Sequence, residues 1–265
     1  MSLVSSMTQT LKQKVLNHPK VAFIHVPKCA GVSVYDGIFK SLYPAYLKGT
    51  PLVTHIDLKG SKRAESLLSI DMMLARQINL VSFMHRKHSL FVTGHCYAAP
   101  QVVADFADWD FVTVLRNPVD RFISEYIYNT YKTSDWHTNT SNFEAYLDTE
   151  KALRSGTGYC RYFSGYAFED ILTQPDDAVV KAAIANLNRF AIVGQLEAMP
   201  VFSAQFEQRY TRSLKIPRAN TSPNHRLADE IKHNRVYRDR IEALCERDTA
   251  IYQAMFKAAP HAQAV

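Results

Sequence analysis

The feature that most constrains the fold is an apolar run that passes through a lysine- and glycine-bearing turn into an amphipathic pattern, over residues 21–34 (VAFIHVPKCAGVSV). This pattern predicts a buried strand, a turn and a helix. Backbone N–H groups in the first turn of a helix lack internal partners and lie at the positive end of the helix dipole, so they attract an anion. Lys28 adds a positive charge, Gly31 permits close approach to the backbone, and Ser33 adds a hydroxyl donor. The segment therefore predicts a site for a phosphate-like anion.

The residue order in this turn differs from that of the nucleotide-triphosphate loop. In that loop, G-x-x-x-x-G-K-[ST], the lysine follows the second glycine, whereas here Lys28 precedes Gly31 and the chain contains no Gly-Lys-Ser/Thr triplet. No apolar strand pattern ends in an acidic residue placed to hold magnesium, on which phosphoryl transfer depends. A sulfuryl group carries less negative charge, so a lysine and N–H donors suffice to bind it. The turn therefore leaves metal-free transfer of a sulfuryl group open as an alternative to phosphoryl transfer, and a kinase-like activity is disfavoured.

A second strand–turn–helix pattern lies at residues 111–128 (FVTVLRNPVDRFISEYIY). Its first five residues form an apolar run of buried-strand length, Asn117 suits an N-cap, and Pro118 suits the first helical position. Apolar residues at helical spacing predict the buried stripe of the helix: Val119, Phe122, Ile123, Tyr126 and Ile127. Arg116 at the strand end and Ser124 off that stripe are expected to face a second phosphate, with the guanidinium as a two-pronged donor.

Both segments resemble the donor-binding motifs of sulfotransferases that use 3′-phosphoadenosine 5′-phosphosulfate (PAPS). The likeness is to the carbohydrate sulfotransferase family that contains heparan sulfate 2-O-sulfotransferase. Residues 25–33 are similar to its 5′-phosphosulfate loop, P-K-[TS]-[AG]-G-T-S, and residues 115–126 to its 3′-phosphate motif, L-R-[DN]-P-x-x-R-x-x-S-x-[YF]. The resemblance implies a PAPS-dependent sulfotransferase whose donor contacts come from Lys28, Cys29, Gly31, Val32, Ser33, Arg116 and Ser124. Because Cys29 and Val32 stand where relatives commonly carry hydroxyl residues, only their backbone N–H groups can contribute.

Candidate strands alternate with helical patterns along the chain. The strands are expected at residues 21–26, 90–96, 111–115 and 190–194. One helix is expected to follow the first turn and end near residue 43, and another to follow the second turn and end near residue 131. Two further helices are expected at residues 61–88 and 228–258. This alternation and the resemblance predict a P-loop-like three-layer α/β fold, with a central, mostly parallel sheet flanked by helices. Ligands bind beyond the carboxyl ends of such strands. Lys28, His95 and Arg116 each lie at or just past an expected strand end, so they should meet at one edge.

His95 is the candidate general base. Sulfuryl transfer to a hydroxyl requires the acceptor proton to leave as oxygen attacks sulfur, and histidine titrates in the range suited to this work. The segment FVTGH, ending at His95, is similar to a family segment whose final histidine is regarded as the base. Heparan sulfate 2-O-sulfotransferase has another histidine two residues earlier, where this chain has Thr93, which argues against a scheme with both histidines. The alternative is that His95 is a loop or core histidine without a chemical role.

Four further features are open to two interpretations. We interpret His25, within the first strand pattern, as a packing residue. Glu197 resembles part of a family segment V-G-x-x-E and is structural or on the substrate side, and Arg161, in a stretch like R-x-L-x-G, is a candidate for reaching the cofactor or the acceptor. Residues 218–223 (RANTSP) lie where relatives have a loop that closes over the cofactor, and they equally suit a solvent-exposed turn.

Composition limits the remaining possibilities. A length of 265 residues with 47% apolar content suits one large α/β domain over residues 1–265, and we expect residues 1–20 to form a loosely ordered N-terminal segment. A net charge of +6 suits anionic ligands and is too small to indicate nucleic-acid binding. The chain has no apolar run of membrane-spanning length and no signal-peptide pattern, and its four cysteines form no C-x-x-C pair. We therefore expect a soluble, cytoplasmic enzyme of bacterial type in preference to a trimmed Golgi-type catalytic domain.

The predicted reaction is in-line transfer of a sulfuryl group from PAPS to a hydroxyl of a carbohydrate or glycoconjugate acceptor, with His95 as base and Lys28 stabilising the charge on the leaving group. The alternative is a non-catalytic protein of the same fold that binds a nucleotide or a sulfated glycan. The sequence identifies neither the acceptor hydroxyl nor the oligomeric state.

Overall fold

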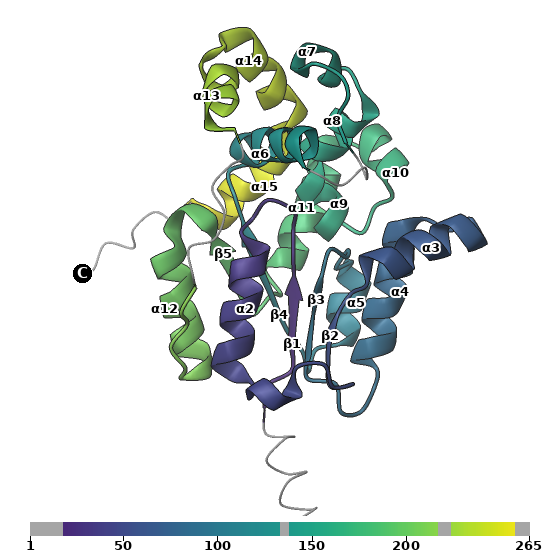
Figure 1. The fold of residues 1–265 in the computed structure, drawn as a ribbon, viewed down its shortest axis with the longest axis vertical. Helices are drawn as coiled ribbons and strands as arrows, with labels where there is room; N and C mark the ends of the chain where they lie inside the picture. Colours follow the sequence, from purple (N-terminus) through teal and green to yellow (C-terminus); the bar gives the residue numbers. More distant parts are fainter. Residues whose placement is uncertain (1–17, 133–137, 217–223, 258–265) are drawn as a thin grey trace, which may run out of the picture.

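The computed structural model describes residues 18–132, 138–216 and 224–257, and these residues contain a five-stranded sheet in the order β2-β3-β1-β4-β5 (Figure 1). All neighbouring strands in it are parallel. The strands are β1 (Val21–Ile24), β2 (Val53–His55), β3 (Phe91–Gly94), β4 (Asp110–Leu115) and β5 (Ile192–Gln195). The expected α/β fold with a central parallel sheet is confirmed.

Helices connect the strands and continue beyond them. In chain order they are α2 (Gly31–Leu42), the short 3-10 helix η1 (Ala45–Leu47), α3 (Leu58–Leu68), α4 (Met72–Met84), α5 (Pro100–Asp105), α6 (Pro118–Tyr131), α7 (Phe143–Tyr146), α8 (Glu150–Gly156), α9 (Gly158–Phe163), α10 (Phe168–Thr173), α11 (Asp176–Leu187), the 3-10 helix η2 (Leu196–Ala198), α12 (Met199–Tyr210), α13 (His225–His233), α14 (Arg235–Leu244) and α15 (Glu246–Phe256). None of the described helices is long and apolar enough to cross a bilayer.

Helices cover both faces of the sheet and give the predicted three layers. On one face, α2 and α12 pack against Phe23, Phe91 and Val112. On the other, α4, α9, α11 and α15 pack against Ile24 and Val92. Neighbouring residues of a strand point to opposite faces, which explains why β1 is apolar at every position and fully buried.

A third apolar cluster lies beyond the sheet, where α6, α7, α13 and α14 gather past the carboxyl ends of the strands (Figure 1). The stripe predicted for α6 forms its centre, with four of the five residues buried and Val119 partly buried: Phe122, Ile123, Tyr126 and Ile127. Asn117 caps this helix, because its side-chain oxygen accepts from the N–H groups of Val119 and Asp120 at 3.1 and 3.2 Å. The cluster therefore anchors α6 over the edge where ligands are expected.

The region between β1 and β3 differs from the prediction in two ways. The helix expected over residues 61–88 is two helices, since Ser69 adopts a left-handed conformation at the end of α3 and Asp71 caps α4. The short strand β2 was not predicted, because it lies at the sheet edge with half-exposed residues and lacks a buried apolar pattern. The other four strands begin and end within two residues of the predicted positions. For example, β1 was expected at residues 21–26 and ends at Ile24.

The expected helix over residues 228–258 is divided into α13, α14 and α15. Asn234 ends α13 and caps α14 by accepting from the N–H of Tyr237 at 3.1 Å. Cys245 separates α14 from α15. Ile231, Ile241 and Ile251 are buried, whereas Leu244, Met255 and Phe256 are partly buried. The prediction of one continuous helix is therefore wrong.

Candidate functional site

The turn between β1 and α2 has the backbone of an anion site. Lys28 and Ala30 adopt left-handed conformations, with φ of 66° and 55°. Ala30 is the N-cap of α2 and supplies no side-chain bond to the helix. Within the described residues, the N–H groups of Gly31, Val32 and Ser33 have no acceptor, in contrast to the capped start of α6. The amino end of α2 is therefore free to bind an anion, as the sequence predicts.

Lys28 and Arg116 come from the ends of β1 and β4 and meet at this turn. Nη1 of Arg116 lies 3.4 Å from the carbonyl oxygen of Lys28 and donates to it. The Lys28 ammonium lies 3.9 Å from the centre of the Tyr128 ring. Burial, with a smaller contribution from Arg116, lowers the pKa of Lys28. Two cations therefore converge without an ion-pair partner among the described residues, which an anionic ligand would supply.

The other residues of the turn differ in their exposure to solvent. Val32 is 65% exposed and Ser33 is buried. Cys29 is buried against Tyr159, with 3.9 Å between Sγ and the tyrosine oxygen, and burial raises the pKa of its thiol to about 11. Its side chain therefore points into the core, and a contact from Cys29 to an anion must use the backbone N–H. Ser124 lies partly exposed on α6, and its hydroxyl has no partner among the described residues.

His95 follows β3 directly and lies beside the turn. Its Nδ1 is 2.7 Å from the carbonyl oxygen of His25. Because a carbonyl oxygen only accepts, Nδ1 carries the proton and Nε2 carries the lone pair. Burial lowers the pKa of His95 to about 4, so the ring is neutral near pH 7. This is the state that a general base requires.

The ring of His25 contacts both His95 and Gly31. His25 lies just past the end of β1, its ring centre is 4.1 Å from that of His95, and a Cβ atom on Gly31 would lie 1.8 Å from its Cδ2 and Nε2 atoms. Burial lowers its pKa well below the ordinary value for histidine. The packing role interpreted from the sequence agrees with these contacts, and they explain why residue 31 is a glycine.

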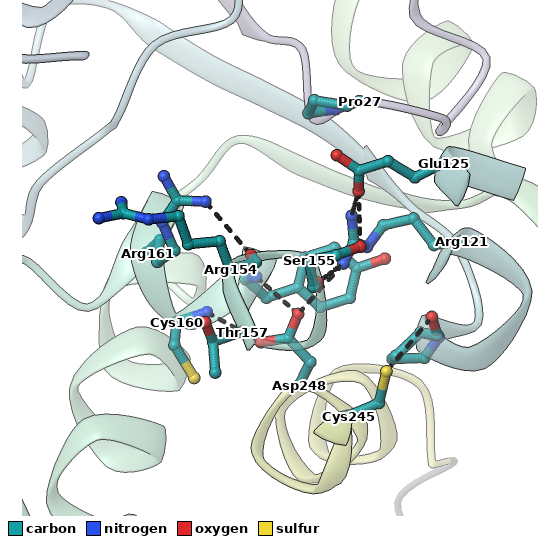
Figure 2. A network of polar contacts seen from close by, with 12 residues as sticks. Pro27, Arg121, Glu125, Arg154, Ser155, Thr157, Cys160, Arg161, Cys245 and Asp248 are labelled. Atoms are coloured by element: carbon teal, nitrogen blue, oxygen red, sulfur yellow. Dashed lines mark hydrogen bonds and ion pairs between the residues drawn. The ribbon is translucent and has the colours of Figure 1, made fainter. Parts of the chain in front are cut away.

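The second arginine of the 111–128 segment is buried in a polar network (Figure 2). Arg121 donates to Glu125 at 2.8 Å and to the carbonyl oxygen of Ser155, and its guanidinium lies 3.9 Å from Asp248. Asp248 accepts from the N–H groups of Tyr159 and Cys160 at 2.8 and 3.0 Å, which caps α9 from α15. Arg121 therefore ties α6 to the neighbouring helices and is not available to a ligand.

Two residues hold the Arg116 turn in place, and sequence reasoning only partly identified them. The Tyr159 hydroxyl accepts from the N–H of Arg116 at 2.8 Å and donates to its carbonyl oxygen. Glu197 accepts from the N–H of Asn117 at 2.8 Å and from the hydroxyl of Tyr252 at 2.8 Å. The structural interpretation of Glu197 is thus supported. Tyr159 was not singled out, because nothing in its local pattern distinguishes it from a core tyrosine.

The partly or fully buried arginines form two groups. Those with a carboxylate partner are Arg121, Arg154, Arg240 and Arg247. Arg76, Arg116 and Arg161 have no ion-pair partner among the described residues. Arg76 donates to the carbonyl oxygen of His95 at 3.3 Å, and Arg161 donates to the hydroxyl of Tyr97 at 2.8 Å. Uncompensated guanidinium groups therefore flank the segment that follows β3.

A cavity of about 710 Å³ lies between α6, α13, α14 and α15 and extends to Asn117, next to Arg116. Its two cations are already neutralised, because Lys232 pairs with Asp120 at 2.6 Å and Arg238 with Glu242 at 2.7 Å. The cavity is therefore a poorer phosphate site than the two turns. Residues 218–223, considered above as a closing loop, lie outside the described residues.

The likeness of the chain to known proteins is distant. No protein-family model and no curated protein matches it. Among solved structures, it matches mouse sulfotransferase SULT7A1 complexed with PAP, at 12% sequence identity and a TM-score of 0.40, over 97% of this chain and 75% of that chain. An assignment of function therefore depends on the residues themselves.

Proposed function

We propose that the protein is a PAPS-dependent sulfotransferase that binds its donor in the two turns after β1 and β4. The observation that carries the proposal is the convergence of Lys28 and Arg116, neither paired with a described carboxylate, at the uncapped end of α2. Two separate cationic turns suit a ligand with phosphates at two positions. PAPS has phosphates on both the 5′ and 3′ oxygens, whereas ordinary adenine nucleotides lack the second.

In this proposal each turn holds one phosphate. Lys28, Ser33 and the N–H groups of Cys29, Gly31 and Val32 bind the 5′-phosphosulfate end, where the helix dipole adds to the attraction. Arg116 and Ser124 bind the 3′-phosphate through charge-assisted hydrogen bonds. Tyr159 fixes the second turn relative to the first, because it contacts the Arg116 backbone and Cys29 together.

The reaction is an in-line displacement at sulfur. The acceptor oxygen forms a bond to sulfur while the bond between sulfur and the bridging oxygen breaks, which releases adenosine 3′,5′-bisphosphate. Nε2 of His95 takes the proton of the attacking hydroxyl, and Lys28 stabilises the charge that grows on the bridging oxygen. His95 is neutral at pH 7 and can accept this proton, and its lowered pKa makes it a weaker base than an ordinary histidine.

We propose a carbohydrate or glycoconjugate acceptor with an anionic substituent. Support comes from Arg76 and Arg161, which have no ion-pair partner in the described part of the chain and flank the segment after His95, and from the aromatic ring of Tyr97 beside Arg161. We further propose a single domain in a reducing cytoplasm, since the four cysteines are buried free thiols.

A second candidate is a protein that binds the nucleotide or a sulfated glycan without turnover. It is favoured by the first turn, where Val32 is exposed and Cys29 points inward, so two side-chain hydroxyl donors found in relatives are missing. For such a protein we expect normal binding of PAPS with slow or absent transfer of the sulfuryl group.

The test is sulfate transfer from ³⁵S-labelled PAPS to a panel of oligosaccharide, glycolipid and small-alcohol acceptors. We expect label in at least one acceptor, loss of transfer in His95→Ala, and unchanged transfer in His88→Ala, an exposed histidine at the opposite end of the sheet. Donor binding without transfer to any acceptor supports the second candidate. Magnesium-dependent ATP turnover in place of sulfate transfer would contradict both.

A further inference from the structure

The His25 ring occupies the space between the donor turn and the candidate base. On one side, its Cδ2 and Nε2 atoms approach Gly31 so closely that a Cβ atom there would lie 1.8 Å away. On the other side, its ring centre is 4.1 Å from that of His95. Its own carbonyl oxygen accepts from Nδ1 of His95 at 2.7 Å. One residue therefore contacts both halves of the site.

The ring nitrogens of His25 are free to bind a ligand. Within the described residues, no donor or acceptor forms a hydrogen bond with either nitrogen, although the ring is partly buried. The charged form is disfavoured by burial and by His95, His55 and Lys28, so the pKa is lowered well below the ordinary value. The imidazole is therefore neutral near pH 7 and carries one N–H donor.

The position of the transferred group follows from the proposed function. The sulfuryl group is bonded to the 5′-phosphate at the amino end of α2 and is attacked by an oxygen that His95 deprotonates. It must therefore lie close to both Gly31 and His95, and so beside the His25 ring, which fills the space between these two residues. A neutral donor at this place binds the sulfuryl oxygens without attracting a second anion.

We propose that His25 is a further catalytic residue, whose ring N–H donates a hydrogen bond to a non-bridging oxygen of the transferring sulfuryl group. This inference rests on the proposed function. No bond to His25 forms or breaks: the sulfur passes from the bridging oxygen to the acceptor oxygen, and the proton passes to His95. A fixed donor aimed at the reacting group stabilises the transition state more than the ground state.

The alternative is that His25 only fills space over Gly31, and two variants separate the roles. His25→Phe keeps a planar ring and removes the N–H, whereas His25→Gln keeps an N–H donor without the ring. The measurements are kcat for transfer, and the affinities for PAPS and for adenosine 3′,5′-bisphosphate, which lacks the sulfuryl group. Far-UV circular dichroism and thermal melting establish that each variant folds.

We expect kcat of His25→Phe to fall by about 10²-fold, the loss typical of one oxyanion donor, while the bisphosphate affinity stays within about twofold. We expect His25→Gln to retain more activity than His25→Phe. Wild-type kcat in His25→Phe, or an equal loss of affinity for both nucleotides, would overturn the inference. If His25→Phe does not fold, His25→Gln and His25→Asn are compared with His25→Ala, and equal kcat in all three overturns it. Failure of the proposed function appears differently, as wild-type protein that neither binds the bisphosphate nor transfers sulfate.

Discussion

The hydroxyl of Tyr159 bonds both backbone groups of Arg116, accepting from its N–H at 2.8 Å and donating to its carbonyl oxygen. The same oxygen lies 3.9 Å from Sγ of Cys29 in the first turn. A buried tyrosine from α9 therefore fixes the relative position of the two turns that the donor must bridge.

Removal of this hydroxyl should weaken both stability and binding. We expect Tyr159→Phe to lower the free energy of unfolding by about 1–3 kcal/mol, because buried polar groups of Arg116 lose their partner, and to weaken bisphosphate binding. Chemical denaturation and isothermal titration measure the two effects. Tyr46→Phe, at a residue 66% exposed, is the matched control and should change neither. Unchanged binding in Tyr159→Phe would show that the link does not position Arg116.

Arg116→Ala should reduce affinity for adenosine 3′,5′-bisphosphate by about 10- to 100-fold, the equivalent of a charged hydrogen bond or two. Affinity for 5′-AMP should change little, since that ligand lacks the 3′-phosphate. Titration of both ligands against the variant measures the difference, with Arg86→Ala, an exposed arginine after α4, as control. An equal loss for the two ligands would contradict the assignment of Arg116 to the 3′-phosphate.

Arg121 should behave in the opposite way from Arg116. Its removal leaves the buried carboxylate of Asp248 and the partly buried carboxylate of Glu125 without the cation that they share. We expect Arg121→Met to lower the free energy of unfolding by about 3–5 kcal/mol, while Arg116→Ala leaves it nearly unchanged. Urea denaturation compares the two variants. Similar stabilities would mean that the network in Figure 2 contributes little.

Gly31→Ala should disrupt the first turn, because the added Cβ atom would overlap the His25 ring. We expect bisphosphate affinity to fall at least tenfold, measured by isothermal titration. The double variant Gly31→Ala/His25→Ala removes the overlap and should recover most of that affinity without recovering transfer. If the single variant binds normally, the His25 ring does not limit residue 31.

Stability should depend on the ionisation of His95. Its pKa in the folded protein is about 4, below its ordinary value of about 6.5, so between these values the unfolded chain binds more protons. The free energy of unfolding should therefore rise as pH increases from 4 to 6.5, by up to about 3 kcal/mol from this residue.

The comparison of wild type with His95→Asn isolates this contribution. This comparison is needed because burial raises the pKa of Asp248 to about 6. As pH rises towards 6, Asp248 therefore lowers the free energy of unfolding, whereas His95 raises it. Denaturation curves at several pH values should show a shallower rise in the variant. Parallel curves would mean that His95 is not desolvated.

The sequence predicted what depends on local pattern and missed what depends on tertiary contact. The apolar runs of β1 and β4 and the Asn-Pro start of α6 were recognisable because strand burial and helix capping are encoded over a few residues. The edge strand β2 and the breaks at Ser69 and Asn234 were not, since each depends on exposure or a single capping residue.

In the candidate site, too, local patterns were predictable from the sequence and tertiary contacts were not. Lys28 and Arg116 follow predicted strand ends, and their proximity follows from the parallel sheet. Tyr159 and Asp248 come from distant helices, and only the folded chain brings them to the two turns. The inward position of Cys29 likewise depends on the core that it contacts.

In the proposed function, the two turns bind the two phosphates of a sulfuryl donor. Isothermal titration of the wild-type protein with adenosine 3′,5′-bisphosphate and with 5′-AMP tests this binding mode. We expect the bisphosphate to bind at least tenfold more tightly, because Arg116 and Ser124 contact only its 3′-phosphate. Equal affinities for the two nucleotides, or no binding of either, would contradict it.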